Sequence, residues 1–212
     1  MKMIIQRLLA ISTVILLSLA LNYATTQDII SLEAGQIGFQ VLLIIYLIQL
    51  FVFLISFVLK TEHYYDLTGG ITYITVIVYT LYQKQLLGTL DFRSILLGVL
   101  ILVWAMRLSS FLFLRIKKAG KDRRFDKIKT NFTRFMLAWA LQGFWVFMCT
   151  LPAITAIASE SKTTDYFLVG GSALWLLGFV LEVVAVRQKS AFNQDQKNKC
   201  QFISTGFWSL SR

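Results

Sequence analysis

Residues 37–59 read IGFQVLLIIYLIQLFVFLISFVL, a run without a single charged side chain. An α-helix rises about 1.5 Å per residue, so about 20 apolar residues cross the hydrocarbon core of a bilayer. Its few polar side chains, Gln40, Gln49 and Ser56, are uncharged. This run therefore predicts a membrane-spanning helix.

Five further segments have similar length and character. The composition agrees, because 57% of the residues are hydrophobic and only 15% are charged, whereas soluble domains have roughly 25% charged residues. This excludes a disordered chain, a disulfide scaffold and an ordinary cytosolic enzyme. We expect an all-α, polytopic membrane bundle that forms one transmembrane domain, 1–212, with six spans: 8–23, 37–59, 67–87, 94–116, 136–157 and 166–186.

The charged residues predict the orientation of these spans. The chain has 21 lysines and arginines, and positively charged loops usually stay in the cytoplasm. If both termini are cytoplasmic, only Lys84, Arg93 and Lys162 lie outside, and Arg107 lies within a span. The outer loops then carry the acidic residues Asp28, Glu33, Asp91, Glu160 and Asp165. The first span could instead be a secretory signal peptide, although residues 21–24 lack a convincing cleavage site.

The loop at residues 60–70 gathers the side chains best suited to proton transfer. It contains Glu62, the single histidine His63, and the neighbouring tyrosines Tyr64 and Tyr65. Such groups could donate a proton to a substrate entering from the inner leaflet. An interfacial belt of aromatic residues explains the tyrosines equally well.

Several other polar residues are candidates for a binding site. Arg107 and Glu182 lie within predicted spans, where charged side chains usually face a partner or a cavity. The basic stretch 115–124 either anchors the topology on anionic lipid or recognises phosphate. Cys149 and Cys200 have no metal-binding spacing, so we expect no metal site. The net charge of +10 follows from topology, and we expect no nucleic-acid partner.

Three segments resemble the steroid 5α-reductase-like membrane reductases, in particular a microbial and algal branch long held as a domain of unknown function. The resemblance covers about residues 40–212, and the third segment is the most specific. The segments are Lys60-Thr61-Glu62 with Tyr65-Asp66-Leu67-Thr68-Gly69; Trp104-Ala105-Met106-Arg107-Leu108 with Arg115-Ile116 and Gly120-Lys121-Asp122-Arg123-Arg124-Phe125; and Glu182, Gln188-Lys189, Phe192, Asn198-Lys199, Gly206-Phe207-Trp208 and Ser211-Arg212.

The resemblance implies a specific chemistry. Members of this family bind NADPH from the cytoplasmic side of a bundle of about seven helices and reduce a carbon–carbon double bond conjugated to a carbonyl, so the expected substrate is a sterol-like or lipid enone. The implied proton donor is Glu62, Tyr64 or Tyr65. The implied cofactor contacts are Arg107, Arg115, Asp122, Arg123, Glu182, Gln188, Lys189 and Arg212.

The sequence departs from the family pattern at two places. Val186 stands where the family has an aspartate, and the family pattern continues with another span after the position of Arg212. The resemblance therefore implies a chain truncated at its C-terminus, with little or no reductase activity by itself.

Two other interpretations stay open. One is a membrane methyltransferase of the isoprenylcysteine or phospholipid type, which would bind S-adenosylmethionine. The other is a non-enzymatic membrane protein, either a degenerate homologue or a small transporter. A bacterial inner membrane and an endoplasmic reticulum fit the sequence equally well, and the oligomeric state is not predicted.

Overall fold

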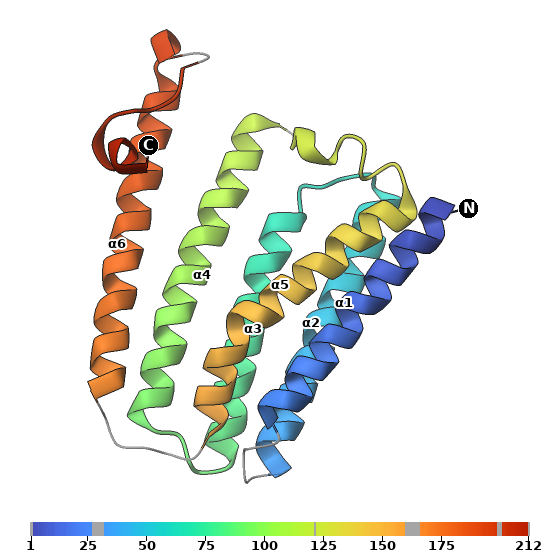
Figure 1. The fold of residues 1–212 in the computed structure, drawn as a ribbon, viewed down its shortest axis with the longest axis vertical. Coiled ribbons are helices and arrows are strands. Elements are labelled where there is room, and N and C mark those ends of the chain that lie inside the picture. Colours follow the sequence, from blue (N-terminus) through green and yellow to red (C-terminus); the bar gives the residue numbers. More distant parts are fainter. Residues whose placement is uncertain (1, 27–31, 121, 160–165, 199–200, 212) are drawn as a thin grey trace. The chain divides into compact units, whose positions relative to one another are not determined.

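The computed structural model describes residues 2–26, 32–120, 122–159, 166–198 and 201–211. The chain divides into two compact units, Met1–Lys162 and Thr163–Arg212, each considered by itself. The first contains α1 Lys2–Thr26, α2 Leu32–Val58, α3 Tyr65–Leu86, α4 Phe92–Ala119, the 3₁₀ turn η1 Arg123–Phe125 and α5 Phe132–Ala158 (Figure 1). The second contains α6 Tyr166–Gln194, η2 Gln196–Asn198 and η3 Gly206–Ser211. The all-α class is confirmed, since no described residue lies in a strand.

Local sequence sets the ends of these helices. The Asp91 carboxylate accepts a hydrogen bond from the Ser94 backbone N–H (2.8 Å) and caps α4, and Asn131 caps α5 through the Arg134 N–H (3.1 Å). Such caps satisfy N–H groups that the first turn leaves without a partner. Gly120 ends α4 with φ of 76°, a backbone conformation that favours glycine.

Five of the six helices, α1, α2, α4, α5 and α6, are long and apolar enough to cross a membrane by length and composition. The exception is α3, which carries Thr68, Thr72, Thr75 and Thr80. Each of these hydroxyls donates to the carbonyl four residues earlier, at 2.6–2.9 Å, so its polarity is satisfied within the helix. Because α3 also packs against α2, α4 and α5, much of its surface is shielded by protein rather than facing lipid.

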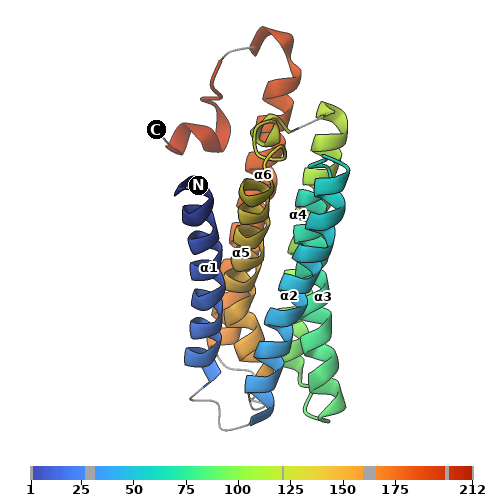
Figure 2. The ribbon, with the colours of Figure 1, turned by 90° about the vertical axis from the view of Figure 1, so that its right-hand side faces the viewer.

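The core of the first unit lies where α2, α3 and α5 meet. Val41, Ile45, Val76, Ile77 and Phe147 are all fully buried there. α5 contacts each of the other four helices of this unit (Figure 2), so it is the central element of the bundle.

Contacts between loops show which connections share an end of this unit. Arg7, near the start of α1, donates to Asn131 Oδ1 (2.8 Å), and His63 Nε2 lies 2.9 Å from the Gly120 carbonyl oxygen. The start of α1 and the α2–α3 and α4–α5 loops therefore lie together (Figure 1). At the opposite end, buried Lys84 donates to the Ser159 carbonyl (2.8 Å). Within this unit, successive connections therefore lie at alternating ends of the bundle, as the distribution of basic loops predicted.

Candidate functional site

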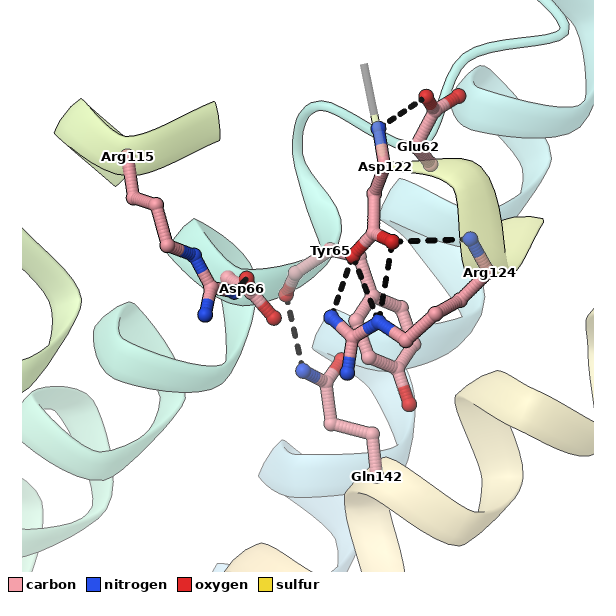
Figure 3. Close-up of polar contacts among 7 residues, drawn as sticks. All are labelled: Glu62, Tyr65, Asp66, Arg115, Asp122, Arg124 and Gln142. Carbon is pink, nitrogen blue, oxygen red and sulfur yellow. Dashed lines mark hydrogen bonds and ion pairs between the residues drawn. The ribbon is translucent and has the colours of Figure 1, made fainter. Parts of the chain in front are cut away.

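Glu62 joins the α2–α3 loop to the α4–α5 loop. Its side chain is only 1% exposed. One carboxylate oxygen accepts the Asp122 backbone N–H (3.1 Å), and the other accepts the Lys129 ammonium (2.5 Å). Figure 3 shows the first of these bonds together with the ion pairs around it. The two loops therefore form one polar cluster, which we call the loop cluster: Glu62, Tyr65, Asp66, Arg115, Asp122, Arg124, Lys129 and Gln142.

Two further acid–base pairs extend the loop cluster. Asp122 is held by Arg124, whose Nε lies 2.8 Å and 3.0 Å from the two carboxylate oxygens and whose Nη2 also donates to it. Asp66, at the start of α3, has one oxygen 3.6 Å from the Arg115 guanidinium. That same oxygen, Oδ2, is buried and accepts no hydrogen bond within the described structure. Arg115 is half-exposed, so its guanidinium remains accessible from outside the cluster.

Tyr65 lies on the inner side of the loop cluster. Its hydroxyl donates to the Ala138 carbonyl (3.0 Å), and its ring packs against Phe125 and Trp139 with centroids 4.8 Å and 5.2 Å away. Gln142 Nε2 donates to the Tyr65 carbonyl (2.9 Å), whereas Gln142 Oε1 is buried without a donor in the described structure.

Gly69 lets Gln142 approach this closely. A Cβ atom at that position would lie 2.8 Å from Gln142 Nε2, which is too short for van der Waals contact. The glycine in the Thr68-Gly69 pair thus helps to fix the position of Gln142, on α5, against the start of α3.

The acids of the loop cluster have pKa values shifted in opposite directions. Burial raises the pKa of Glu62, but the bonds from Lys129 and from the Asp122 N–H outweigh it and hold the pKa below its ordinary value. Hydrogen bonds from Arg124 likewise lower the pKa of Asp122, against a smaller effect of burial. Burial raises the pKa of Asp66 despite the nearby Arg124 and Arg115. Burial, with the Asp66 charge, also raises the pKa of Tyr65 to about 12.

The three predicted proton donors therefore have different environments. Glu62 is a buried carboxylate that is ionised at neutral pH, which suits an anchor between loops better than an acid. The Tyr65 hydroxyl is already donating to a backbone carbonyl. Tyr64 is 41% exposed, so its hydroxyl is the most accessible of the three.

The predicted cofactor contacts are divided between the two units. Arg115 and Asp122 belong to the loop cluster. Arg107 lies on α4 and interacts with a partner, outside the contacts that define the cluster. The side chain of Arg123 and the whole of Arg212 lie outside the described residues. Glu182, Gln188 and Lys189 lie on α6, in the second unit.

Within the second unit, the most specific segment of the resemblance forms a local fold. Gln188 Oε1 accepts the Phe207 backbone N–H (3.1 Å), the Trp208 indole N–H donates to the Ala185 carbonyl (3.0 Å), and the Lys189 ammonium lies 5.1 Å from the Trp208 ring centroid. Gly206 permits the turn, with φ of 64° and no room for a Cβ beside Gln188. Gln188 and Lys189 thus hold η3 against α6.

Sequence reasoning missed four members of the loop cluster as site residues: Asp66, Arg124, Lys129 and Gln142. Asp66 and Arg124 lie inside the segments that carry the resemblance, and this position in the sequence could have identified them as site residues. No local pattern marks Lys129 or Gln142, because their partners lie 67 and 77 residues away in the chain.

The opposite pKa shifts predict opposite effects of two isosteric changes. Asp122→Asn should destabilise the protein by about 1 kcal/mol at neutral pH, because it weakens the charge-assisted bonds with Arg124. The loss stays small because the Arg124 side chain is exposed to solvent. Because the folded-state pKa of Asp122 is lowered, this loss should vanish as pH falls through that value. Asp66→Asn should stabilise the protein at neutral pH, because ionised Asp66 is disfavoured by burial, and the gain should vanish in acid. Chemical unfolding in detergent between pH 2 and pH 8 measures both, and equal pH dependence of the two variants would contradict the assignment.

Comparison with known proteins identifies the family but no activity. The family model described as "Protein of unknown function (DUF1295)" matches residues 52–212, which include the whole loop cluster. No curated protein and no solved structure matches the chain. Since the matched residues make up most of its length, the chain belongs to the DUF1295 family of proteins of unknown function.

Proposed function

We propose that this protein is a membrane-embedded, NADPH-dependent reductase. Its reaction would saturate a carbon–carbon double bond conjugated to a carbonyl in a sterol-like or lipid substrate. One observation carries the proposal. Two segments of the reductase resemblance, residues 60–69 and 115–125, are far apart in sequence, yet meet in the loop cluster through the Glu62–Asp122 and Asp66–Arg115 contacts.

The chemistry of the loop cluster suits a dinucleotide. The half-exposed guanidinium of Arg115 and the exposed side chain of Arg124 can pair with phosphate oxygens. NADPH, when bound, supplies the hydride.

The chain's own residues would hold the loops and supply the proton. Ionised Glu62 fixes both loops around the site, and Asp122 orients Arg124 toward an incoming phosphate. The accessible Tyr64 hydroxyl would donate to the substrate's carbonyl oxygen as negative charge develops there. Burial raises the pKa of Asp66, so this carboxyl is a second candidate for proton exchange in the site.

The loop cluster would face the cytoplasm, where NADPH is available. The basic residues that surround it support this orientation, because positively charged loops remain on the cytoplasmic side. The start of α1 would then also be cytoplasmic, because Arg7 contacts Asn131 in the α4–α5 loop.

Binding of NADPH to the full chain in detergent tests the proposal, with NADH and S-adenosylmethionine as competitors. We expect saturable quenching of tryptophan fluorescence by NADPH. Arg115→Ala should weaken binding by about tenfold, the equivalent of one lost charge-assisted contact of about 1.4 kcal/mol. Arg93→Ala, which removes an arginine at the opposite end of the same helix, is the matched control and should leave the affinity unchanged.

Two outcomes would overturn the proposal. Saturable binding of S-adenosylmethionine without NADPH would identify a methyltransferase. Failure of a correctly folded chain to bind either compound would favour a non-enzymatic membrane protein.

A further inference from the structure

The first unit contains an apolar groove between α1, α2 and α5. It has a volume of about 320 Å³ and is lined by side chains from residues 11–19 of α1, 39–53 of α2 and 136–140 of α5. Along α2 the lining extends over about 21 Å, since each helical residue adds about 1.5 Å. One leaflet of a bilayer has a hydrocarbon depth of about 15 Å. The groove is therefore long enough to follow one acyl chain through a leaflet.

The lining of the groove offers almost no polar group to a ligand. Among the residues that the structure describes, no charged side chain lines it. The Tyr46 hydroxyl shares a hydrogen bond with Ser18 Oγ (2.8 Å), and the Gln49 amide donates to Thr72 (3.3 Å) on α3, away from the lining. A carbonyl or hydroxyl group would lose its bonds to water there without replacement. The lining therefore favours a plain alkyl chain.

The groove is accessible from the lipid. Leu19 of α1 and Phe39, Leu43 and Leu50 of α2 line it, and each of them is 38–53% exposed. Both helices are apolar enough to cross a membrane, so these exposed side chains would face lipid. An acyl chain could therefore enter the groove sideways from the bilayer.

A cationic side chain lies at the loop-cluster end of the groove. Arg7 precedes the first lining residue of α1 by four positions, so it continues the stripe at residues 11–19 by one helical turn. Its Nη1 donates to Asn131 Oδ1 (2.8 Å) and to Thr133 Oγ1 (3.3 Å). Thr133 in turn precedes the lining residue Met136 by about one turn of α5. Arg7 therefore crosses from α1 to α5 one turn beyond the groove on both helices.

Arg7 keeps the capacity to bind an anion. A guanidinium carries five N–H donors, and only Nη1 of Arg7 donates to acceptors within the described residues. No carboxylate pairs with Arg7 in that part of the chain. Arg7 also immediately precedes the predicted span 8–23, which places it at the depth of lipid headgroups. A guanidinium there, next to an alkyl groove, matches the two parts of an anionic phospholipid.

We propose that the groove holds one acyl chain of an anionic phospholipid from the leaflet on the loop-cluster side, with the lipid phosphate paired to Arg7. A zwitterionic phospholipid carries a cation beside its phosphate and would be held less strongly. The bound lipid would fill the space between α1 and α2 and strengthen the contact of α1 with α5. No lining residue belongs to the loop cluster, so the inference stands independently of the reductase proposal.

Brominated lipids test this directly, because bromine on an acyl chain quenches tryptophan fluorescence only at short range. Trp139 lines the groove and is 1% exposed, so lipid outside the groove does not reach it. The full chain, with its other tryptophans changed to phenylalanine, is placed in phosphatidylcholine nanodiscs. We expect phosphatidylglycerol with dibrominated chains to quench Trp139. Phosphatidylcholine with the same chains should need about a fivefold higher mole fraction, the factor that one arginine gives with anionic lipid.

Three further proteins isolate the headgroup contact. Arg7→Gln removes the charge but keeps a side chain able to bond Asn131, and it should lose the preference for phosphatidylglycerol. Arg134→Gln makes the same change at an exposed arginine on the face of α5 opposite Met136, since two residues turn a helix by about 200°, and it should keep the preference. A chain whose single tryptophan is Trp145, which is 67% exposed, should be quenched equally by both lipids.

The proposal fails if the two brominated lipids quench Trp139 equally, if neither quenches it, or if the folded Arg7→Gln variant keeps the preference. If the single-tryptophan chain does not fold, native mass spectrometry of the wild-type and Arg7→Gln chains gives a second test. Retention of phosphatidylglycerol over phosphatidylcholine by the wild-type chain alone supports the proposal, and equal retention of both lipids contradicts it. No NADPH is present in these assays, so their failure would leave the reductase proposal untouched.

Discussion

Replacing Gly70 with alanine is expected to destabilise the protein by about 2–3 kcal/mol, the upper part of the range for inserting a methyl group into a packed interior. The new Cβ would lie 1.6 Å from Ser109 Oγ and 2.3 Å from Ser109 Cβ. A rotamer change can move Oγ, but Cβ is fixed to the backbone of α4. Helices α3 and α4 must therefore separate, and this disturbs the packing that holds α3 inside the bundle.

Gly178→Ala is the matched control, because Gly178 also lies within a helix and an added Cβ there would meet nothing within 4 Å. We expect that variant to be neutral, or stabilised by up to about 1 kcal/mol through helix propensity. Ser109→Gly in the Gly70→Ala background should recover much of the lost stability, because it removes both clashing atoms. Urea unfolding in mixed micelles measures all three variants, and a Gly70→Ala effect no larger than that of Gly178→Ala would disprove the close contact.

Glu62→Ala is expected to destabilise the protein by about 2–4 kcal/mol at neutral pH, because it leaves the Asp122 N–H and the Lys129 ammonium without their shared acceptor. The lower part of this range applies if Lys129, which is 23% exposed, turns toward water. The pKa of Glu62 is lowered in the folded state, so its stabilisation is present above the unfolded-state pKa and is lost as pH falls through the folded-state value.

Lys129→Ala is the informative partner in this comparison. It should cost less than Glu62→Ala, because Glu62 keeps the Asp122 N–H as a donor, and the double variant should cost less than the sum of the two single changes. Limited proteolysis of residues 120–131 should accelerate in Glu62→Ala. If Glu62→Ala instead unfolds like the wild-type chain, Glu62 does not anchor the loops, and a role in proton transfer becomes its better explanation.

The helices were predictable because each is specified by its own residues. The predicted span 37–59 lies inside α2 except for its last residue, and the predicted span 94–116 lies inside α4. Long apolar runs and capping residues such as Asp91 are local signals. The sequence predicted a membrane-spanning helix at 67–87. A helix, α3, lies there, but its threonines keep it outside the five helices that are apolar enough to cross a membrane. The neighbouring helices α2, α4 and α5 shield the polar surface of α3. A hydropathy average over the local sequence does not contain this tertiary contact.

The loop cluster was only partly predictable because it depends on pairing between distant residues. Glu62 and Asp122 each stood out as candidates, yet their hydrogen bond crosses 60 positions of the chain. The role expected for Glu62 as an acid depended on its residue type and on the family resemblance, whereas its two donors favour the ionised form. Gln188 and Lys189 illustrate the same limit, since a pattern matched to cofactor binding also holds η3 against α6. Their expected contact with NADPH stays a prediction.

Hydrogen–deuterium exchange of the full chain in nanodiscs, with and without NADPH, tests the central claim most directly. The claim is that the α2–α3 and α4–α5 loops form one nucleotide site. It predicts that peptides covering residues 60–66 and 115–125 both gain protection at saturating NADPH, and that neither does so with S-adenosylmethionine. Unchanged exchange in both loops, in a sample that retains the protected helices of the folded bundle, would contradict it.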